Sequence, residues 1–159
     1  KKRDFPKAIE AYKNYLDEMK SSPDISDLFL YGRLNYYAAT DSAYQDKQPT
    51  YLAEADTIFA QVAVKVPDNY LGNFWRARVN SLRDPETTQG LAKPYYEAAL
   101  SILEQKPDAT KSVLVECNSY LGYYYFVKED YNQSKQYWNK ILEIDPENET
   151  ATKALGGIK

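Results

Sequence analysis

The chain contains 159 residues, of which 43% are hydrophobic and 27% are charged. This composition is typical of one folded globular domain and excludes a disordered chain. The net charge of −3 offers no excess of positive charge to a nucleic acid, so we expect no nucleic-acid partner. Apolar stretches fall well short of the roughly 20 residues that span a bilayer, so we expect no membrane insertion.

The residue types exclude most enzyme chemistry. The sequence contains 16 tyrosines but no histidine, which removes the commonest general base and the commonest metal ligand. Cys117 is the single cysteine, so neither a disulfide nor a thiolate zinc site can form within the chain. We therefore expect no enzymatic activity, no metal and no other cofactor. A binding or scaffolding role remains.

The spacing of apolar residues predicts helices along most of the chain. These residues recur at intervals of three and four, and no segment shows the strict alternation typical of strands. Asp130, followed three residues later by Gln133, indicates the start of one helix. Pro94 predicts that another helix begins late, near Ala92 or Lys93. Further helix boundaries are indicated by proline–acid pairs at 23–24, 67–68, 107–108 and 146–147.

The sequence also repeats itself. Segments 29–35, 74–80 and 119–125 align, and the same place in each holds a small residue: Gly32, Ala77 and Gly122. Glycine inside a helix costs about 1 kcal/mol, so its recurrence implies the close approach of a neighbouring helix. Self-similarity at a fixed period in paired helices predicts a solenoid.

At these residues the sequence resembles the tetratricopeptide repeat family. Asn118 stands where the family usually has Trp, and Ser134 stands where it usually has Ala. The clearest copy carries Leu121, Gly122, Tyr125, Ser134, Trp138 and Pro146 at the family's spacing. Two copies are less regular. One is marked by Ala55, Phe59 and Pro67, and the other by Ala77, Ala92, Tyr96 and Ala99.

The resemblance implies an all-α fold, a right-handed superhelix of about eight helices in antiparallel pairs. We expect one domain over 1–159. Residues 1–22 are expected to form the second helix of a truncated repeat. Three repeats follow at 23–67, which has a long loop, 68–107 and 108–146. A capping helix is expected at 147–159. The incomplete first copy indicates a fragment of a longer array. A targeting segment would lie outside such a fragment, so the compartment, cytoplasm or periplasm, stays open.

The resemblance also implies a function, because first helices of this family line a concave groove that binds peptides or proteins. We expect Trp75 and Tyr120 to be exposed in that groove, although aromatic stripes at helical spacing more often belong to a core. Arg33 and Arg78 are candidates either for binding a carboxylate or phosphate or for pairing with an internal acid. The groove positions are Phe29, Arg33, Tyr36, Tyr37, Phe74, Trp75, Arg78, Tyr120, Tyr123 and Phe126.

The predicted function is therefore a scaffold for protein–protein interaction that holds a partner peptide or protein in an aromatic, arginine-containing groove. The alternative is a structural spacer or a module for homo-oligomerisation, for example as a homodimer, within a larger protein. The sequence does not identify the partner.

Overall fold

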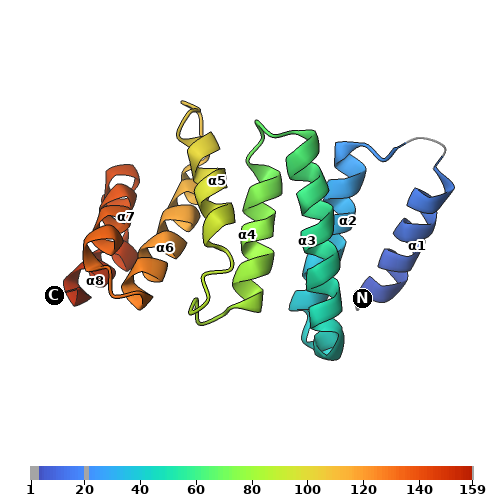
Figure 1. The fold of residues 1–159 in the computed structure, drawn as a ribbon, viewed down its shortest axis with the longest axis horizontal. Coiled ribbons are helices and arrows are strands. Elements are labelled where there is room, and N and C mark those ends of the chain that lie inside the picture. The colour runs from blue at the N-terminus through green and yellow to red at the C-terminus, as the bar shows by residue number, and fades with distance from the viewer. Residues whose placement is uncertain (1–3, 20–21, 159) are drawn as a thin grey trace. The chain divides into compact units, whose positions relative to one another are not determined.

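The computed structural model describes residues 4–19 and 22–158, so the basic run at 1–3 lies outside the described part. Within that part the chain is all-α, as predicted, and no residue is in a strand. The helices shown in Figure 1 are α1 (Phe5–Glu18), α2 (Ile25–Thr40), the 3₁₀-helix η1 (Ser42–Lys47), α3 (Gln48–Lys65), α4 (Leu71–Arg83), α5 (Lys93–Leu103), α6 (Lys111–Val127), α7 (Tyr131–Ile144) and α8 (Glu149–Gly157).

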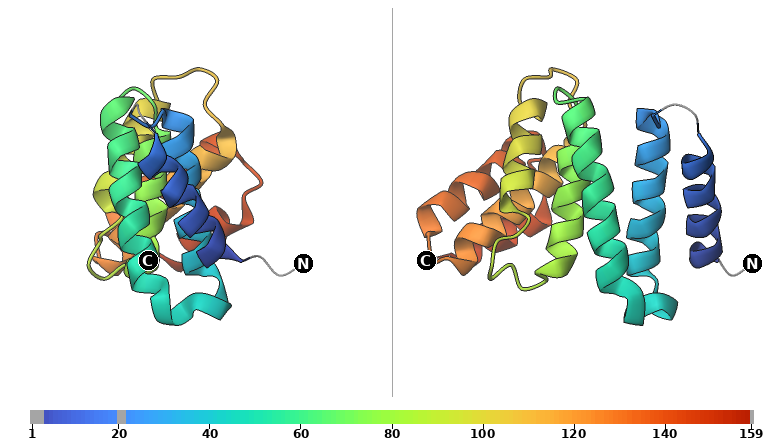
Figure 2. Two further views of the ribbon diagram at one scale, coloured as in Figure 1. Left: turned by 90° about the vertical axis from the view of Figure 1, so that its right-hand side faces the viewer. Right: turned by 45° about the vertical axis from the view of Figure 1, so that its right-hand side comes forward.

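The chain divides into two compact units, a first unit of residues 1–83 and a second unit of residues 84–159. The division falls inside the expected repeat 68–107, and the repeat boundaries stay a prediction. In the first unit, α1 to α4 lie side by side and alternate in direction (Figure 2). In the second unit, α6 packs against both α5 and α7, and α7 packs against α8.

Helix ends follow the capping chemistry that the sequence indicated. The Asp24 side chain accepts a hydrogen bond from the backbone N–H of Asp27 at 2.8 Å and begins α2. Asp130 accepts in the same way from the backbone N–H of Gln133 at 3.1 Å, which confirms the predicted start of α7. Helix α5 begins at Lys93 with Pro94 in its first turn, also as predicted.

Small residues bring paired helices into close contact. A Cβ atom built on Gly32 of α2 would lie 2.7 Å from Cε1 of Phe59 in α3. One built on Gly122 of α6 would lie 2.7 Å from Cε2 of Trp138 in α7. Ala77 is fully buried. The prediction that these positions face neighbouring helices is therefore confirmed.

Another close contact was not apparent from the repeats. A Cβ atom on Gly72 of α4 would lie 2.5 Å from the backbone nitrogen of Ala63 in α3. Because that neighbour is backbone, it cannot rotate away, and only glycine fits. Gly72 precedes the aligned segment 74–80, so the comparison of repeats gave it no partner.

Helix α8 extends through Gly156 and Gly157. Leu155 and Gly156 lie one period of about 34 residues after Leu121 and Gly122. Unlike Gly122, Gly156 has no atom within 4 Å of an added Cβ.

The long connection between α4 and α5 is organised around Asp84, which is buried. Its Oδ2 accepts hydrogen bonds from the backbone N–H groups of Gln89, Gly90 and Leu91 at 3.0, 2.7 and 3.4 Å. Burial alone would raise the pKa of Asp84, but these hydrogen bonds to the ionised form outweigh it and hold the pKa below its ordinary value of 3.8. The carboxylate therefore fixes the conformation of this loop.

The Gly122 contact predicts opposite effects of one chemical change at two sites. Gly122→Ala should lower the free energy of unfolding by about 1–3 kcal/mol, because the new methyl group overlaps the Trp138 ring. Gly156→Ala should raise it by up to about 1 kcal/mol, because alanine favours the helix and meets no neighbour. Urea unfolding of both variants measures the difference, and a neutral Gly122→Ala would contradict the contact.

The loop carboxylate predicts a pH dependence of stability. In the folded chain the pKa of Asp84 lies below 3.8, its ordinary value in the unfolded chain. The carboxylate therefore stabilises the fold fully at pH values above the unfolded-state pKa. This stabilisation is lost as the pH falls through the folded-state pKa. Asp84→Asn should lower the free energy of unfolding at pH 7 by about 1–3 kcal/mol. Denaturant unfolding from pH 7 to pH 3 should show a smaller acid-induced loss for the variant than for the parent chain. Equal losses would show that the loop does not depend on the charge.

Candidate functional site

Aromatic rings from α2 and α3 converge on Trp75 of α4 in the first unit. The ring centroids of Phe29, Tyr36 and Phe59 lie 5.8, 5.2 and 5.5 Å from that of Trp75. Phe59 stacks on the indole, whereas Phe29 and Tyr36 meet it edge-on, and both arrangements are favourable for aromatic pairs. We call the whole group the aromatic–arginine cluster; its members are Phe29, Arg33, Tyr36, Tyr37, Phe59, Trp75 and Arg78.

Guanidinium groups from different helices approach the same indole. Cζ of Arg33 in α2 lies 5.5 Å from the ring centroid of Trp75, and Cζ of Arg78 in α4 lies 4.9 Å from it. Arg33 also lies 5.4 Å from the ring of Tyr37 and donates a hydrogen bond from Nη2 to the Tyr37 hydroxyl at 3.2 Å. These contacts place both cations by cation–π attraction.

Arg76 of α4 and Arg33 of α2 have different electrostatic environments. Arg76 forms an ion pair with Asp56 of α3 at 3.0 Å, and Asn80 donates a hydrogen bond to the same carboxylate. Arg33 has no carboxylate partner among the described residues, and its Nε is buried without a hydrogen-bond partner. Arg76 therefore serves packing between α3 and α4, whereas the charge of Arg33 is not neutralised within the described chain.

Trp75 is only 6% exposed and Phe74 only 3%, so the expectation that Trp75 is exposed is wrong. The indole, which α4 supplies, lies at the centre of the cluster because α2 and α3 both direct rings toward it. The half-buried members are Phe29, Arg33, Tyr36, Tyr37 and Arg78. Six of the predicted groove residues are thus brought together, with the indole beneath the residues that solvent reaches.

Tyr120, in the second unit, is also buried, which corrects the second exposure prediction. Its ring stacks on that of Tyr96 with centroids 4.6 Å apart. Burial raises the pKa of the Tyr120 hydroxyl to about 12, so the group stays protonated at neutral pH. Tyr125 is likewise engaged in packing and stacks on Tyr137 at 5.6 Å.

Tyr123 and Phe126 are the exposed aromatics of α6, at 43% and 42%. They line a largely apolar pocket of about 240 Å³ between α6, α7 and α8. The other lining residues are Trp138, Lys153, Ala154, Gly157 and Ile158. The contribution of α8 was missed from the sequence, although the recurrence of Leu-Gly at 155–156 signals another helix in the repeat register.

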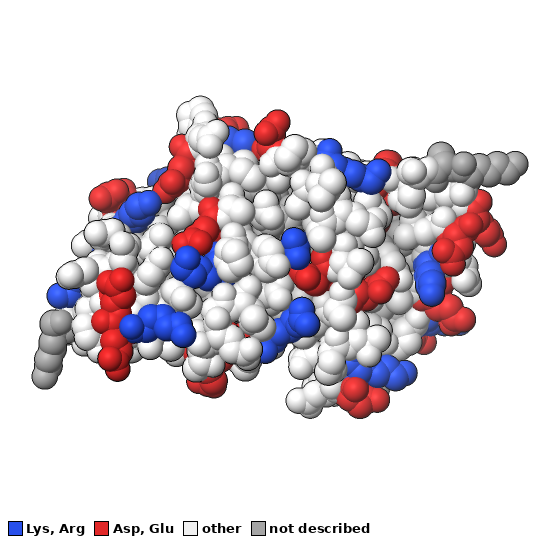
Figure 3. Space-filling view, viewed as in Figure 1, with Lys and Arg blue, Asp and Glu red and all other residues white. Residues whose placement is uncertain are grey.

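The described residues contain no group of acidic or cysteine side chains that could hold a metal ion. Among the described helices, none has the length and apolarity that crossing a bilayer requires. Acidic and basic side chains are interspersed on the face shown in Figure 3. The predicted groove residues that solvent reaches lie on two surfaces, one in each unit.

Neither a protein-family model nor a curated protein matches the sequence. Among solved structures, the fold is similar to that of the C-terminal part of a TPR repeat-containing protein from Cytophaga hutchinsonii. The superposition covers 96% of this chain with a TM-score of 0.82 and 33% sequence identity. It covers 54% of the other chain, so this chain spans about half the length of that structure.

The burial of Trp75 predicts that the cluster stabilises the first unit. Trp75→Ala should lower the free energy of unfolding by about 3–5 kcal/mol, because it leaves a cavity beneath three rings. Tyr123→Ala removes an exposed ring and should change it by no more than about 0.5 kcal/mol. Chemical denaturation of Trp75→Ala and Tyr123→Ala measures both changes in the free energy of unfolding. A small effect at Trp75 would show that the indole does not support the packing.

Proposed function

We propose that this chain, which has a tetratricopeptide-repeat fold, is a protein-interaction scaffold that binds a segment of a partner protein on the aromatic–arginine cluster. The fold supports a protein partner in general. The cluster supports the location, because aromatic and arginine side chains are enriched among residues that dominate binding energies.

The observation that carries the proposal is the environment of Arg33. Its guanidinium lies within 6 Å of the rings of Phe29, Tyr37 and Trp75, without a carboxylate among the described residues. A carboxylate is the planar anion that a guanidinium binds best. We therefore infer that the bound segment supplies an aspartate, a glutamate or a C-terminal carboxylate to Arg33.

The rigidity of the cluster supports tight binding by few residues. Arg33 is held by the Tyr37 hydroxyl and by surrounding rings, so little side-chain entropy is lost when it meets an anion. The half-buried rings of Phe29 and Tyr36 offer apolar contact next to that charge. An acidic residue next to an aromatic or aliphatic one would satisfy both features.

The pocket beside Tyr123 and Phe126 supports a second contact, made by the second unit. Its lining is mostly apolar, so it suits an aliphatic or aromatic side chain rather than a charged group. This contact would add to the affinity without determining the preference for an acidic segment.

Selection of peptides from a displayed random library on the immobilised chain tests the proposal. The enriched peptides should share a carboxylate next to an apolar residue. A synthetic copy of an enriched peptide should bind Arg33→Gln at least about tenfold more weakly than the parent chain, because the charge-assisted hydrogen bonds are lost. Fluorescence anisotropy measures both dissociation constants.

Arg83→Gln is the matched control, since Arg83 is an exposed arginine at the end of α4 outside the cluster. It should leave the affinity of the peptide unchanged. Peptides without a shared acidic residue, or equal losses in Arg33→Gln and Arg83→Gln, would contradict the proposal. Binding should also weaken as salt rises, because the contact with Arg33 is ionic.

A further inference from the structure

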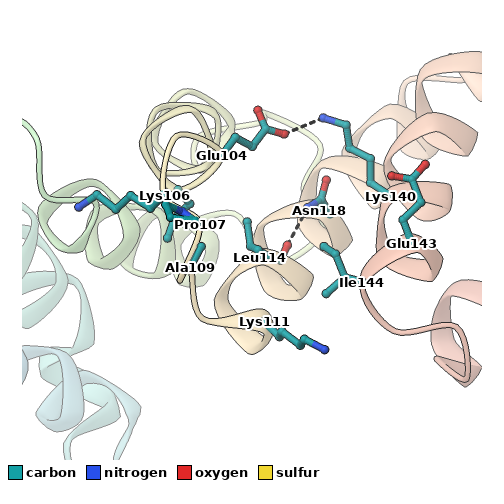
Figure 4. A pocket seen from close by; sticks show the side chains of 11 residues that line it. Glu104, Lys106, Pro107, Ala109, Lys111, Leu114, Asn118, Lys140, Glu143 and Ile144 are labelled. Atoms are coloured by element: carbon teal, nitrogen blue, oxygen red, sulfur yellow. Dashed lines mark hydrogen bonds and ion pairs between the residues drawn. The ribbon is translucent and has the colours of Figure 1, made fainter.

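A pocket of about 450 Å³ lies in the second unit, where the C-terminal end of α5, the start of α6 and the C-terminal half of α7 meet (Figure 4). Its volume is in the range of pockets that bind small molecules or single side chains. Leu103, Leu114 and Ile144 contribute apolar surface, and lysine and glutamate side chains surround them. None of its residues belongs to the aromatic–arginine cluster or to the pocket beside Tyr123.

Asn118 lines this pocket and is the one uncharged polar side chain in its lining. It is 1% exposed, and its Nδ2 donates a hydrogen bond to the backbone carbonyl of Leu114 at 2.8 Å. Its Oδ1 is buried and has no hydrogen-bond partner. Figure 4 shows this oxygen directed away from Leu114, toward the side of the pocket where Glu104 and Lys140 meet. Buried acceptors are rarely left unpaired, so the site lacks a donor.

The register of the repeat indicates which group supplies that donor. Asn118 precedes Leu121 and Gly122 by the spacing at which the repeat pattern has tryptophan. An asparagine is much smaller than a tryptophan, so the exchange leaves open volume next to the position of an indole. The same exchange places the unpaired Oδ1 acceptor of Asn118 at this pocket.

The rim of the pocket is compatible with an aromatic guest. Lys140 pairs with Glu104 at 2.8 Å, but the two side chains are 44% and 49% exposed. An ion pair this exposed contributes little stability, so a ligand can displace it at small cost. The released ammonium group can then lie over the face of an aromatic ring, where it is attracted by cation–π interaction.

We propose that this pocket binds the tryptophan side chain of a partner protein, with the indole N–H donating to Oδ1 of Asn118. The apolar residues Leu103, Leu114 and Ile144 cover the ring, and Lys140 lies at its face. An indole matches this site better than a phenol or an alkyl chain, because it combines a large apolar ring with a donor and carries no acceptor.

The test uses N-acetyl-L-tryptophanamide as the probe and two-dimensional ¹H–¹⁵N spectra of the intact chain as the readout. The probe should shift the side-chain amide signals of Asn118 and the backbone signals of the pocket residues in a saturable way. Its benzothienyl analogue, in which sulfur replaces the indole N–H, should bind at least about fivefold more weakly, because it cannot donate to Oδ1. Equal midpoints for the two probes would overturn the proposal, as would the absence of a saturable shift at Asn118.

Asn118→Trp supplies an internal indole and should abolish binding of the probe while the helical spectrum is retained. Asn139→Trp, at an exposed position of α7, is the matched control and should bind the probe as the parent chain does. Unchanged binding to a folded Asn118→Trp variant would place the probe elsewhere and overturn the proposal. If Asn118→Trp does not fold, the comparison of the two probes on the parent chain still tests whether the indole N–H donates to Oδ1 of Asn118. Arg33→Gln should bind the probe normally, so this result is independent of the proposed peptide site.

Discussion

The structure depends on one recurring contact, in which an aromatic ring of one helix lies directly on a glycine of its partner. Phe59 lies on Gly32 in the first unit, and Trp138 lies on Gly122 in the second. Because glycine has no side chain, the ring touches the neighbouring helix itself, and the two helices pack closely. The hydroxyl of Ser134 adds a buried hydrogen bond to the carbonyl of Gly122 at 2.7 Å. These contacts determine which faces of the paired helices remain available for binding.

The same rings connect packing to the candidate site. Phe59 lies on Gly32 and also stacks on Trp75, so one side chain joins α2, α3 and α4. Trp75 in turn holds Arg33 and Arg78 by its electron-rich face. The buried indole thus supports the candidate site indirectly, because it fixes the positions of the half-buried Arg33 and Arg78 side chains. This arrangement explains how a residue can be essential to a surface without being exposed on it.

Each unit buries one tryptophan of the chain, Trp75 in the first unit and Trp138 in the second. In the first unit the chain supplies its own indole, Trp75, and encloses it with rings and guanidinium groups. In the second unit Asn118 stands at a tryptophan position of the repeat, and a pocket with an unpaired acceptor takes the place of the ring. Leu103, Leu114 and Ile144 line this pocket, which supports the proposal that it receives the indole of a partner.

The sequence was sufficient to predict the helical class, the pairing of helices at small residues and several helix starts, because these depend on local spacing and on capping within a few residues. It also identified most members of the aromatic–arginine cluster as neighbours. Only the tertiary structure decided that Trp75 and Tyr120 are buried while Tyr123 and Phe126 are exposed. All four are aromatic residues of α4 or α6, and their exposure depends on which side chains of other helices cover them. The Asn118 pocket was equally hidden, because it is formed by segments of α5, α6 and α7 that meet only when the chain folds.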